Sequence, residues 1–218
     1  MRPAQTLLLG LILLVPVLAF LFLKSFGTNR YALPTFLPDH VDSTQVSGKW
    51  QRDTVFHQIG DFRFPSQAGR EITQAELADK GLYVANFFST TCSGICPQVS
   101  AQLSRVQEKF RQEPRVRLAS FTVDPTHDSI AVLARYAEQY GAIAGKWFFL
   151  TGNQAGLNQL AAREFRLSME GSGLVQSQKI FLVDKNRQVR GMYDGTSEKE
   201  INRLITEIGV LLYTYDHE

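Results

Sequence analysis

The sequence has very little excess charge of either sign. It contains 23 Lys and Arg residues against 21 Asp and Glu residues, so the formal net charge is only +2 in a chain of 218 residues. Proteins that bind nucleic acid usually carry a strongly basic patch, because Lys and Arg neutralise the phosphates. The near balance of charge therefore argues against nucleic acid as a partner.

Cysteine is also scarce, since Cys92 and Cys96 are the only two in the chain. Two cysteines this close in sequence cannot link distant parts of a fold, which excludes a disulfide-rich scaffold. A disulfide between them would constrain the unfolded chain by only roughly 2 kcal/mol. A small structural disulfide and a chemically active pair both remain open at this stage.

The N-terminus carries a long apolar segment. Residues 7–23 contain no charge and lie between Arg2 and Lys24. A spanning helix needs about 20 apolar residues, so the segment is slightly short and a cleaved signal peptide is the alternative. No small-residue cleavage pattern follows it, and we expect an uncleaved transmembrane anchor after a short tail, residues 1–6. Basic residues alone do not settle its orientation; we expect the domain outside the cytoplasm, on the periplasmic side.

The rest of the chain divides into a linker, residues 24–52, and one globular domain, residues 53–216. The linker contains prolines, glycines and polar residues without an apolar period. In the domain, short apolar runs alternate with helical patterns. The runs predict buried strands at 82–88, 118–123, 147–150 and 180–183. The helical patterns predict helices at 99–110, 130–140, 155–165 and from residue 197 onward.

The order of these elements predicts an α/β fold. Only residues 185–187 separate the last two strands, which suits an antiparallel hairpin. Upstream, an edge strand or hairpin is expected near residues 61–64, and Thr73 with Glu76 matches a capping box for a short helix. A mixed central sheet with helices on both faces, and a cysteine pair after its first buried strand, is typical of the thioredoxin-like fold.

The two cysteines lie where open α/β sheets place their sites. The segment Cys92-Ser93-Gly94-Ile95-Cys96-Pro97 connects the strand that ends near Ser89 to the next helix, and proline suits a first helical turn. Free backbone N–H groups at a helix N-terminus stabilise a thiolate and lower its pKa. The pair is therefore predicted to be redox-active or to bind a soft metal.

Five stretches of the domain match the pattern of one known family. They are residues 88–97, 122–128, 136–141, 147–152 and 181–184. On these residues the chain resembles the Sco/SenC family of membrane-anchored, thioredoxin-fold proteins. The resemblance implies a copper metallochaperone that assists assembly of the binuclear copper centre of cytochrome c oxidase. The implied partner is the copper subunit of the oxidase or another extracytoplasmic thiol or copper protein.

The resemblance also implies a copper site, and here the chain departs from the family pattern. The family binds copper with two cysteines and one histidine, which assigns Cys92 and Cys96 as ligands. The family's histidine lies eight residues before the Asp that closes the next strand, and counting back from Asp184 gives Gln176. Two thiolates can hold soft Cu(I), whereas Cu(II) prefers imidazole nitrogen. We therefore expect Cu(I) rather than Cu(II), or no copper at all.

Three further residues are candidates for the site. Met169 offers a soft thioether ahead of Gln176, although a lone methionine more often fills a gap in a core. His127 follows the second predicted strand on the same sheet edge as the cysteines, but the turn and helix-cap pattern around it explains it equally. Asp124 at the end of that strand would move protons during thiol exchange, or it simply forms the turn before Pro125.

Two functions of different classes stay open. The leading one is a Sco-like accessory protein that delivers Cu(I) to, or reduces the cysteines of, a copper-receiving partner. The other is a thiol-disulfide oxidoreductase without a metal role, which needs only a thiolate, a resolving cysteine and access. No proline follows Pro125, so the cis-proline that faces the cysteines in thioredoxins is missing, which favours a dedicated partner. The motif Pro-x-x-x-Thr-x-x-Cys of a peroxiredoxin is also missing.

Overall fold

The computed structural model describes residues 12–22, 33–46, 49–79, 81–170, 173–174 and 178–217. Contacts divide the chain into two compact units, Met1–Ala32 and Leu33–Glu218. In the first unit, residues 12–22 are helical, and their apolar side chains are exposed. No helix within the described ranges is long and apolar enough to cross a membrane. The predicted anchor, residues 7–23, lies partly outside these ranges and stays a prediction.

The second unit is built on a central sheet of five strands in the order β11-β10-β5-β6-β7. The strands are β5 (Leu82–Phe88), β6 (Val116–Thr122), β7 (Trp147–Leu150), β10 (Lys179–Val183) and β11 (Val189–Asp194). β5, β6 and β7 run parallel, while β10 is antiparallel to both β5 and β11. The predicted mixed sheet with its C-terminal hairpin is therefore confirmed.

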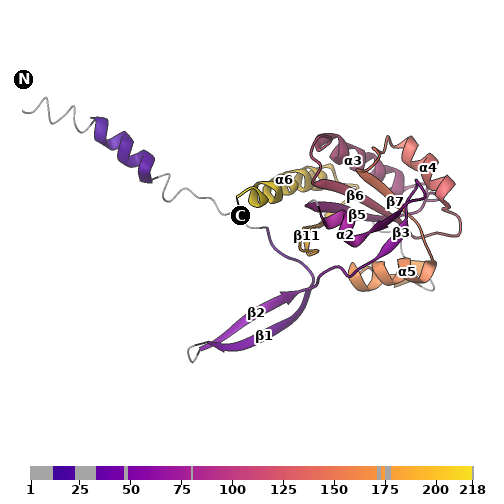
Figure 1. Ribbon diagram of the computed structural model, residues 1–218, viewed down its shortest axis with the longest axis horizontal. Helices are drawn as coiled ribbons and strands as arrows, with labels where there is room; N and C mark the ends of the chain where they lie inside the picture. Colours follow the sequence, from indigo (N-terminus) through magenta and orange to yellow (C-terminus); the bar gives the residue numbers. More distant parts are fainter. Residues whose placement is uncertain are drawn as a thin grey trace, which may run out of the picture. The chain divides into compact units, whose positions relative to one another are not determined.

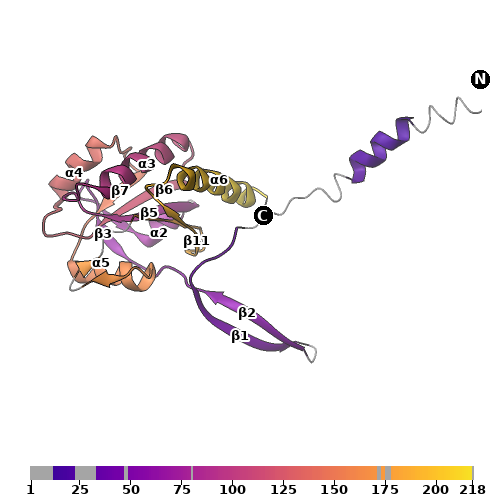
Figure 2. The same cartoon turned by 180° about the vertical axis from the view of Figure 1, so that it is seen from behind.

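Helices cover both faces of this sheet, as predicted (Figures 1 and 2). One face packs against α3 (Ile95–Lys109), α4 (Ile130–Gln139) and α6 (Glu198–Tyr215). The other face packs against α2 (Gln74–Asp79), α5 (Gln154–Gln159) and the π-helix η1 (Leu160–Glu164). The order of strands and helices in the chain is the one expected for a thioredoxin-like fold.

The central strand β5 explains why its sequence reads as a continuous apolar run. Its seven residues are all buried, because helices cover the sheet on both sides. Side chains alternate along a strand, so Val84 and Phe88 join the core under α3 and α6. Tyr83 and Phe87 point the other way and join the core beside α5. One strand thus supplies both halves of the hydrophobic core.

The predicted helix signals act where the sequence places them. The Thr73 hydroxyl accepts the N–H of Glu76 at 3.1 Å, at the start of α2. The Ser197 hydroxyl accepts the N–H of Glu200 at 3.4 Å and caps α6. Gly141, just after α4, has a φ of +64°, a left-handed conformation that favours glycine and ends the helix.

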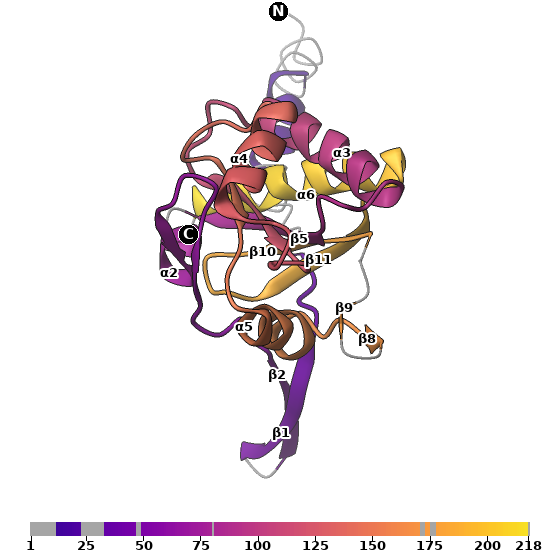
Figure 3. The ribbon, with the colours of Figure 1, turned by 90° about the vertical axis from the view of Figure 1, so that its right-hand side faces the viewer.

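The structure differs from the sequence prediction in the expected linker, residues 24–52. Strands β1 (Pro38–Val46) and β2 (Lys49–Phe56) pair as an antiparallel hairpin, which lies at the bottom of Figure 3. Side chains 39–43 and 53–55 are exposed, so no alternation of apolar residues marks these strands. Their pairing rests on backbone hydrogen bonds, which leave no pattern in the sequence.

Three shorter stretches complete the unit. β3 (Arg63–Pro65) and β4 (Glu71–Thr73) form the small hairpin that the sequence indicates near residues 61–64. β8 (Met169–Glu170) and β9 (Gly173–Leu174) form a further two-residue pairing that the sequence did not indicate. Strands this short carry too few residues to show a period.

Candidate functional site

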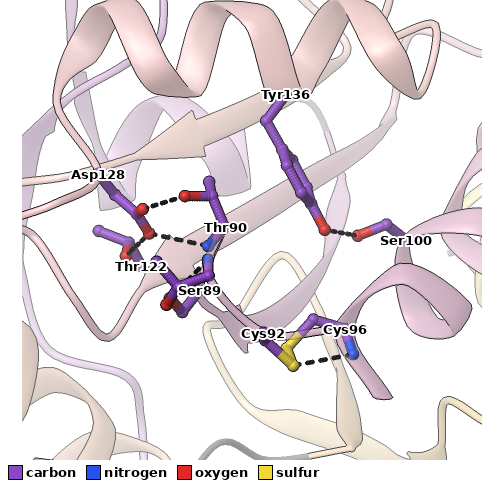
Figure 4. Close-up of a disulfide and its surroundings, with 9 residues drawn as sticks. Ser89, Thr90, Cys92, Cys96, Ser100, Thr122, Asp128 and Tyr136 are labelled. Carbon is purple, nitrogen blue, oxygen red and sulfur yellow. Dashed lines mark hydrogen bonds between the residues drawn. A yellow bond between two sulfur atoms is a disulfide. The ribbon is translucent and has the colours of Figure 1, made fainter. Parts of the chain in front are cut away.

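The cysteine pair lies between the carboxyl end of β5 and the first turn of α3, as predicted (Figure 4). Cys92 and Cys96 are joined by a disulfide, with their Cα atoms 5.8 Å apart. Cys92 belongs to the loop, whereas Cys96 is the second residue of α3. The two sulfurs therefore come from different structural elements, a loop and a helix.

The two cysteines differ in their exposure to solvent. Cys96 has only 4% of its surface exposed and packs in the core beside Val99 and Leu103. Cys92 is half-buried and lies at the edge of the same core. Because a sulfur must be reached before it can be attacked or can attack, Cys92 is the accessible member of the pair.

The start of α3 supplies a hydrogen-bond donor to the accessible sulfur. The backbone N–H of Cys96 donates to Sγ of Cys92 at 3.2 Å (Figure 4). N–H groups in the first turn have no partner inside the helix, and they favour a negative charge placed before them. A thiolate on Cys92 would be stabilised by this contact. The arrangement can thus supply a nucleophile or a soft-metal ligand.

A hydrogen bond between two neutral hydroxyl groups lies one turn along α3 from the disulfide. Ser100, one turn after Cys96, has its hydroxyl 3.0 Å from the hydroxyl of Tyr136 on α4. Burial raises the pKa of Tyr136 well above its usual range, and the bond to Ser100 opposes that rise only in part. The phenol therefore stays neutral and joins α3 to α4 without placing a charge beside the sulfurs.

The loop before Cys92 is tied to the loop after β6. β5 and β6 pair in parallel with Phe88 opposite Thr122, so the residues that follow the two strands lie side by side. Asp128, which is fully buried, accepts hydrogen bonds from the hydroxyl and the backbone N–H of Thr90 and from the hydroxyl of Thr122 (Figure 4). The sequence analysis did not single out Asp128 as a site residue. Its only distinction in the sequence is that it ends the matched stretch 122–128.

Asp124 and His127 lie beside the hydrogen bonds of Asp128. No described hydrogen bond joins either residue to a cysteine. The hydrogen bonds of Asp124 lie within residues 122–128, and its Oδ1 accepts the hydroxyl of Thr126 at 2.7 Å. His127 is exposed, and its Nδ1 lies 3.0 Å from Oδ1 of Asp128 and 3.2 Å from Oγ1 of Thr90. These contacts suit the turn that the sequence offered as the simpler explanation, and the proton-transfer role of Asp124 stays a prediction.

The predicted third-ligand position, Gln176, lies outside the described residues. Met169 is described only through its backbone, in β8. Within the described ranges, no group of three His, Cys, Asp or Glu side chains could hold a metal ion. Cys92 and Cys96 are described as a disulfide; once reduced, two thiolates would suit soft Cu(I) better than Cu(II).

Comparison with known families identifies one match. The family model described as SCO1/SenC matches residues 51–210, which is most of the chain. Among curated proteins, the SCO1 protein homolog of Bacillus subtilis is 29% identical over 167 residues, covering 74% of this chain and 86% of that protein.

Solved structures agree with this match. BsSco, described as a member of the Sco family of cytochrome c oxidase assembly proteins with a disulfide switch, is 26% identical with a TM-score of 0.62. The match covers 70% of this chain and 92% of BsSco. Arabidopsis thaliana ScoI with copper bound is 22% identical with a TM-score of 0.57, over 68% of this chain and 96% of that one, and this likeness shows the fold alone.

Proposed function

The chain belongs to the SCO1/SenC family, and on this premise we propose that it is an accessory protein for assembly of the copper centre of cytochrome c oxidase. Its working group is the cysteine pair Cys92 and Cys96. Residues 7–23 hold it at the membrane, with the domain on the periplasmic side. The copper subunit of the oxidase, which must receive copper on its cysteines, is the partner.

The step that the described residues support best is reduction of a disulfide in the partner. The thiolate of Cys92 attacks one sulfur of that disulfide, forms a mixed disulfide and releases the partner's first thiolate. The thiolate of Cys96 then attacks Sγ of Cys92 and releases the second thiolate. Two electrons pass to the partner, which becomes a dithiol, and the disulfide between Cys92 and Cys96 remains. A dithiol reductant must then restore the pair.

The observation that carries this proposal is the asymmetry of the two sulfurs. Cys92 is half-buried and receives the N–H of Cys96, while Cys96 is almost fully buried. A mixed disulfide needs an accessible, stabilised thiolate, and a resolving thiolate needs only to reach the first sulfur. Each cysteine has the environment of one of these two roles.

Delivery of Cu(I) by the same pair is the second mode of this function. Two thiolates suit Cu(I), which is soft and accepts low coordination numbers. Arabidopsis ScoI, a protein of the same fold, has a structure with copper bound. Gln176 in place of the family's histidine weighs against stable Cu(II) binding. A thiol-disulfide oxidoreductase with no metal role is the remaining alternative.

An anaerobic copper titration followed by a redox titration of the full chain separates these modes. We expect one Cu(I) to bind only while both cysteines are reduced, and we expect the disulfide to titrate reversibly against glutathione. Reversible titration without Cu(I) binding would favour the metal-free oxidoreductase. A disulfide that no dithiol reduces in the folded protein would leave it a structural bond and overturn the proposal.

A further inference from the structure

We propose that Asp128 is the positioning residue of the cysteine loop: it holds Thr90, and through Thr90 it places Cys92 within reach of Cys96. This inference rests on the proposed function, because it concerns the same pair of sulfurs. Asp128 lies after β6 and Thr90 after β5, and Figure 4 shows the two side chains facing each other.

The carboxylate of Asp128 is contacted by Thr122 at the end of β6, by Thr90 in the loop after β5 and by His127 beside it in the chain. Its exposed fraction is 0%, so solvent does not stabilise its charge. Thr122 at the end of β6 donates its hydroxyl to Oδ2 at 2.5 Å, and the backbone N–H of Thr90 donates to the same oxygen at 3.2 Å. The hydroxyl of Thr90 donates to Oδ1. Because an unpaired buried carboxylate is strongly destabilising, these bonds hold the Thr90 loop against β6.

One short turn of the chain connects Thr90, which is bonded to Asp128, with Cys92. Thr90 stands two residues before Cys92, and the N–H of Cys92 donates to the carbonyl of Ser89 at 3.3 Å. The N–H of Thr91 donates to Oγ of Ser89 at 3.2 Å. Cys96 is held separately, by its place in α3 and in the core. The helix thus positions one sulfur, and Asp128 positions the other.

This arrangement has a consequence for the redox equilibrium. Asp128 and Thr90 both lie outside the ring that the disulfide closes, so their bond does not depend on that closure. In the dithiol form it confines Cys92 near Cys96 and raises the effective concentration of one thiol at the other. Loss of the bond should therefore disfavour the disulfide and make it easier to reduce.

The decisive test is the redox equilibrium of the full chain, in detergent, with glutathione. Thr90→Val removes the hydroxyl at nearly constant volume, and we expect disulfide formation to become about tenfold less favourable, a shift of about 30 mV to a less negative potential. Thr90→Ser keeps the hydroxyl and should retain the wild-type potential. Asp128→Asn, which removes the charge, should shift the potential in the same direction as Thr90→Val.

Thr126→Val is the matched control. Thr126 lies in the same loop as Asp128 but donates its hydroxyl to Asp124, so its loss should leave the potential unchanged. A role confined to folding would lower the stability of both redox forms without moving the potential. If Thr90→Val titrates reversibly at the wild-type potential, Asp128 does not position the loop. If the wild-type disulfide itself does not titrate, the proposed function fails, which is a different result.

Discussion

At the scale of single residues, chemistry depends on what surrounds each sulfur. Cys92 is half-buried, and its sulfur accepts the N–H of Cys96, whereas Cys96 has 4% of its surface exposed. A backbone donor at a helix N-terminus favours the charged form of a thiol. Burial among apolar side chains disfavours it. We therefore expect the two thiols to titrate apart once the disulfide is reduced.

Alkylation of the reduced protein with iodoacetamide at a series of pH values tests this expectation. In Cys96→Ser, Cys92 should react with an apparent pKa below about 8.5, the reference value for a free cysteine. In Cys92→Ser, Cys96 should react much more slowly, because its side chain is buried. An apparent pKa for Cys92 at or above the reference value would remove the case for an activated thiol.

The substitution Gln176→His tests the position that the family pattern assigns to the third copper ligand. We expect the wild-type chain to hold Cu(II) poorly and Gln176→His to bind it tightly, because imidazole supplies the nitrogen that Cu(II) prefers. A Cu(II)–thiolate charge-transfer band should appear in the variant and vanish when either cysteine becomes serine. If the wild-type chain already binds Cu(II) as tightly as the variant, another residue such as His127 completes the site.

The sequence allowed the cysteines to be located but not the residue that supports them. Cys92 and Cys96 are conspicuous because no other cysteine occurs, and a strand-to-helix junction places them at the sheet edge. Asp128 becomes visible only when the parallel pairing of β5 and β6 brings its loop beside Thr90. A contact across 38 residues of chain leaves no local pattern that a single sequence reveals.

At the scale of elements, the sequence pattern predicted the bounds of the strands that are buried on both faces better than it predicted the type of each helix. The strands β5 and β7 lie within their predicted bounds, because burial on both faces requires an unbroken apolar run. α5 is interrupted: its predicted helix at 155–165 becomes a short α-helix followed by the π-helix η1, whose wider turn inserts one extra residue. Periodicity does not distinguish these two kinds of turn.

Helix α6 offers two neighbouring positions where alanine should have opposite effects on stability. Ile208 is fully buried against the sheet, so Ile208→Ala should lower the free energy of unfolding by about 2–5 kcal/mol. Gly209 is exposed, and a Cβ added there would meet no atom within 4 Å. Gly209→Ala should therefore raise the free energy of unfolding by about 0.5–1 kcal/mol, because it removes freedom from the unfolded chain.

Urea denaturation of both variants, with the disulfide in the same redox state, measures the two effects. The midpoint should fall for Ile208→Ala and rise for Gly209→Ala, with little change in the dependence on urea. The two shifts need not be equal in size, only opposite in sign. A loss of stability in Gly209→Ala would mean that α6 is covered on its outer side.

At the scale of the whole molecule, the chain combines an apolar N-terminal segment with a domain that carries the Cys92–Cys96 disulfide. The helical residues 12–22 expose Leu13, Leu18 and Phe20, which is costly in water and favourable in a bilayer. Unit Leu33–Glu218 has its own two-sided core. Such a division suits an anchored protein whose domain works at the membrane surface.

Protease treatment of spheroplasts tests this topology. On the proposal that residues 7–23 anchor the chain with its domain outside, we expect externally added protease to digest the domain while a cytoplasmic marker stays intact. If the domain is shielded together with the marker, the domain faces the cytoplasm and the predicted orientation is wrong. A domain released from the membrane fraction without protease would show that the apolar segment is cleaved as a signal peptide.

Trapping of the mixed disulfide tests the central claim most directly. Cys96→Ser, reduced and mixed without oxygen with the oxidised copper-binding domain of the oxidase copper subunit, should stop at a covalent complex joined through Cys92 when the partner's released thiol is alkylated at once, since no thiol is then left to break the mixed disulfide. Wild-type protein should instead leave the partner as a free dithiol. Absence of a complex with Cys96→Ser, or equal trapping by Cys92→Ser, would contradict the assignment of Cys92 as the attacking sulfur in a redox-active pair.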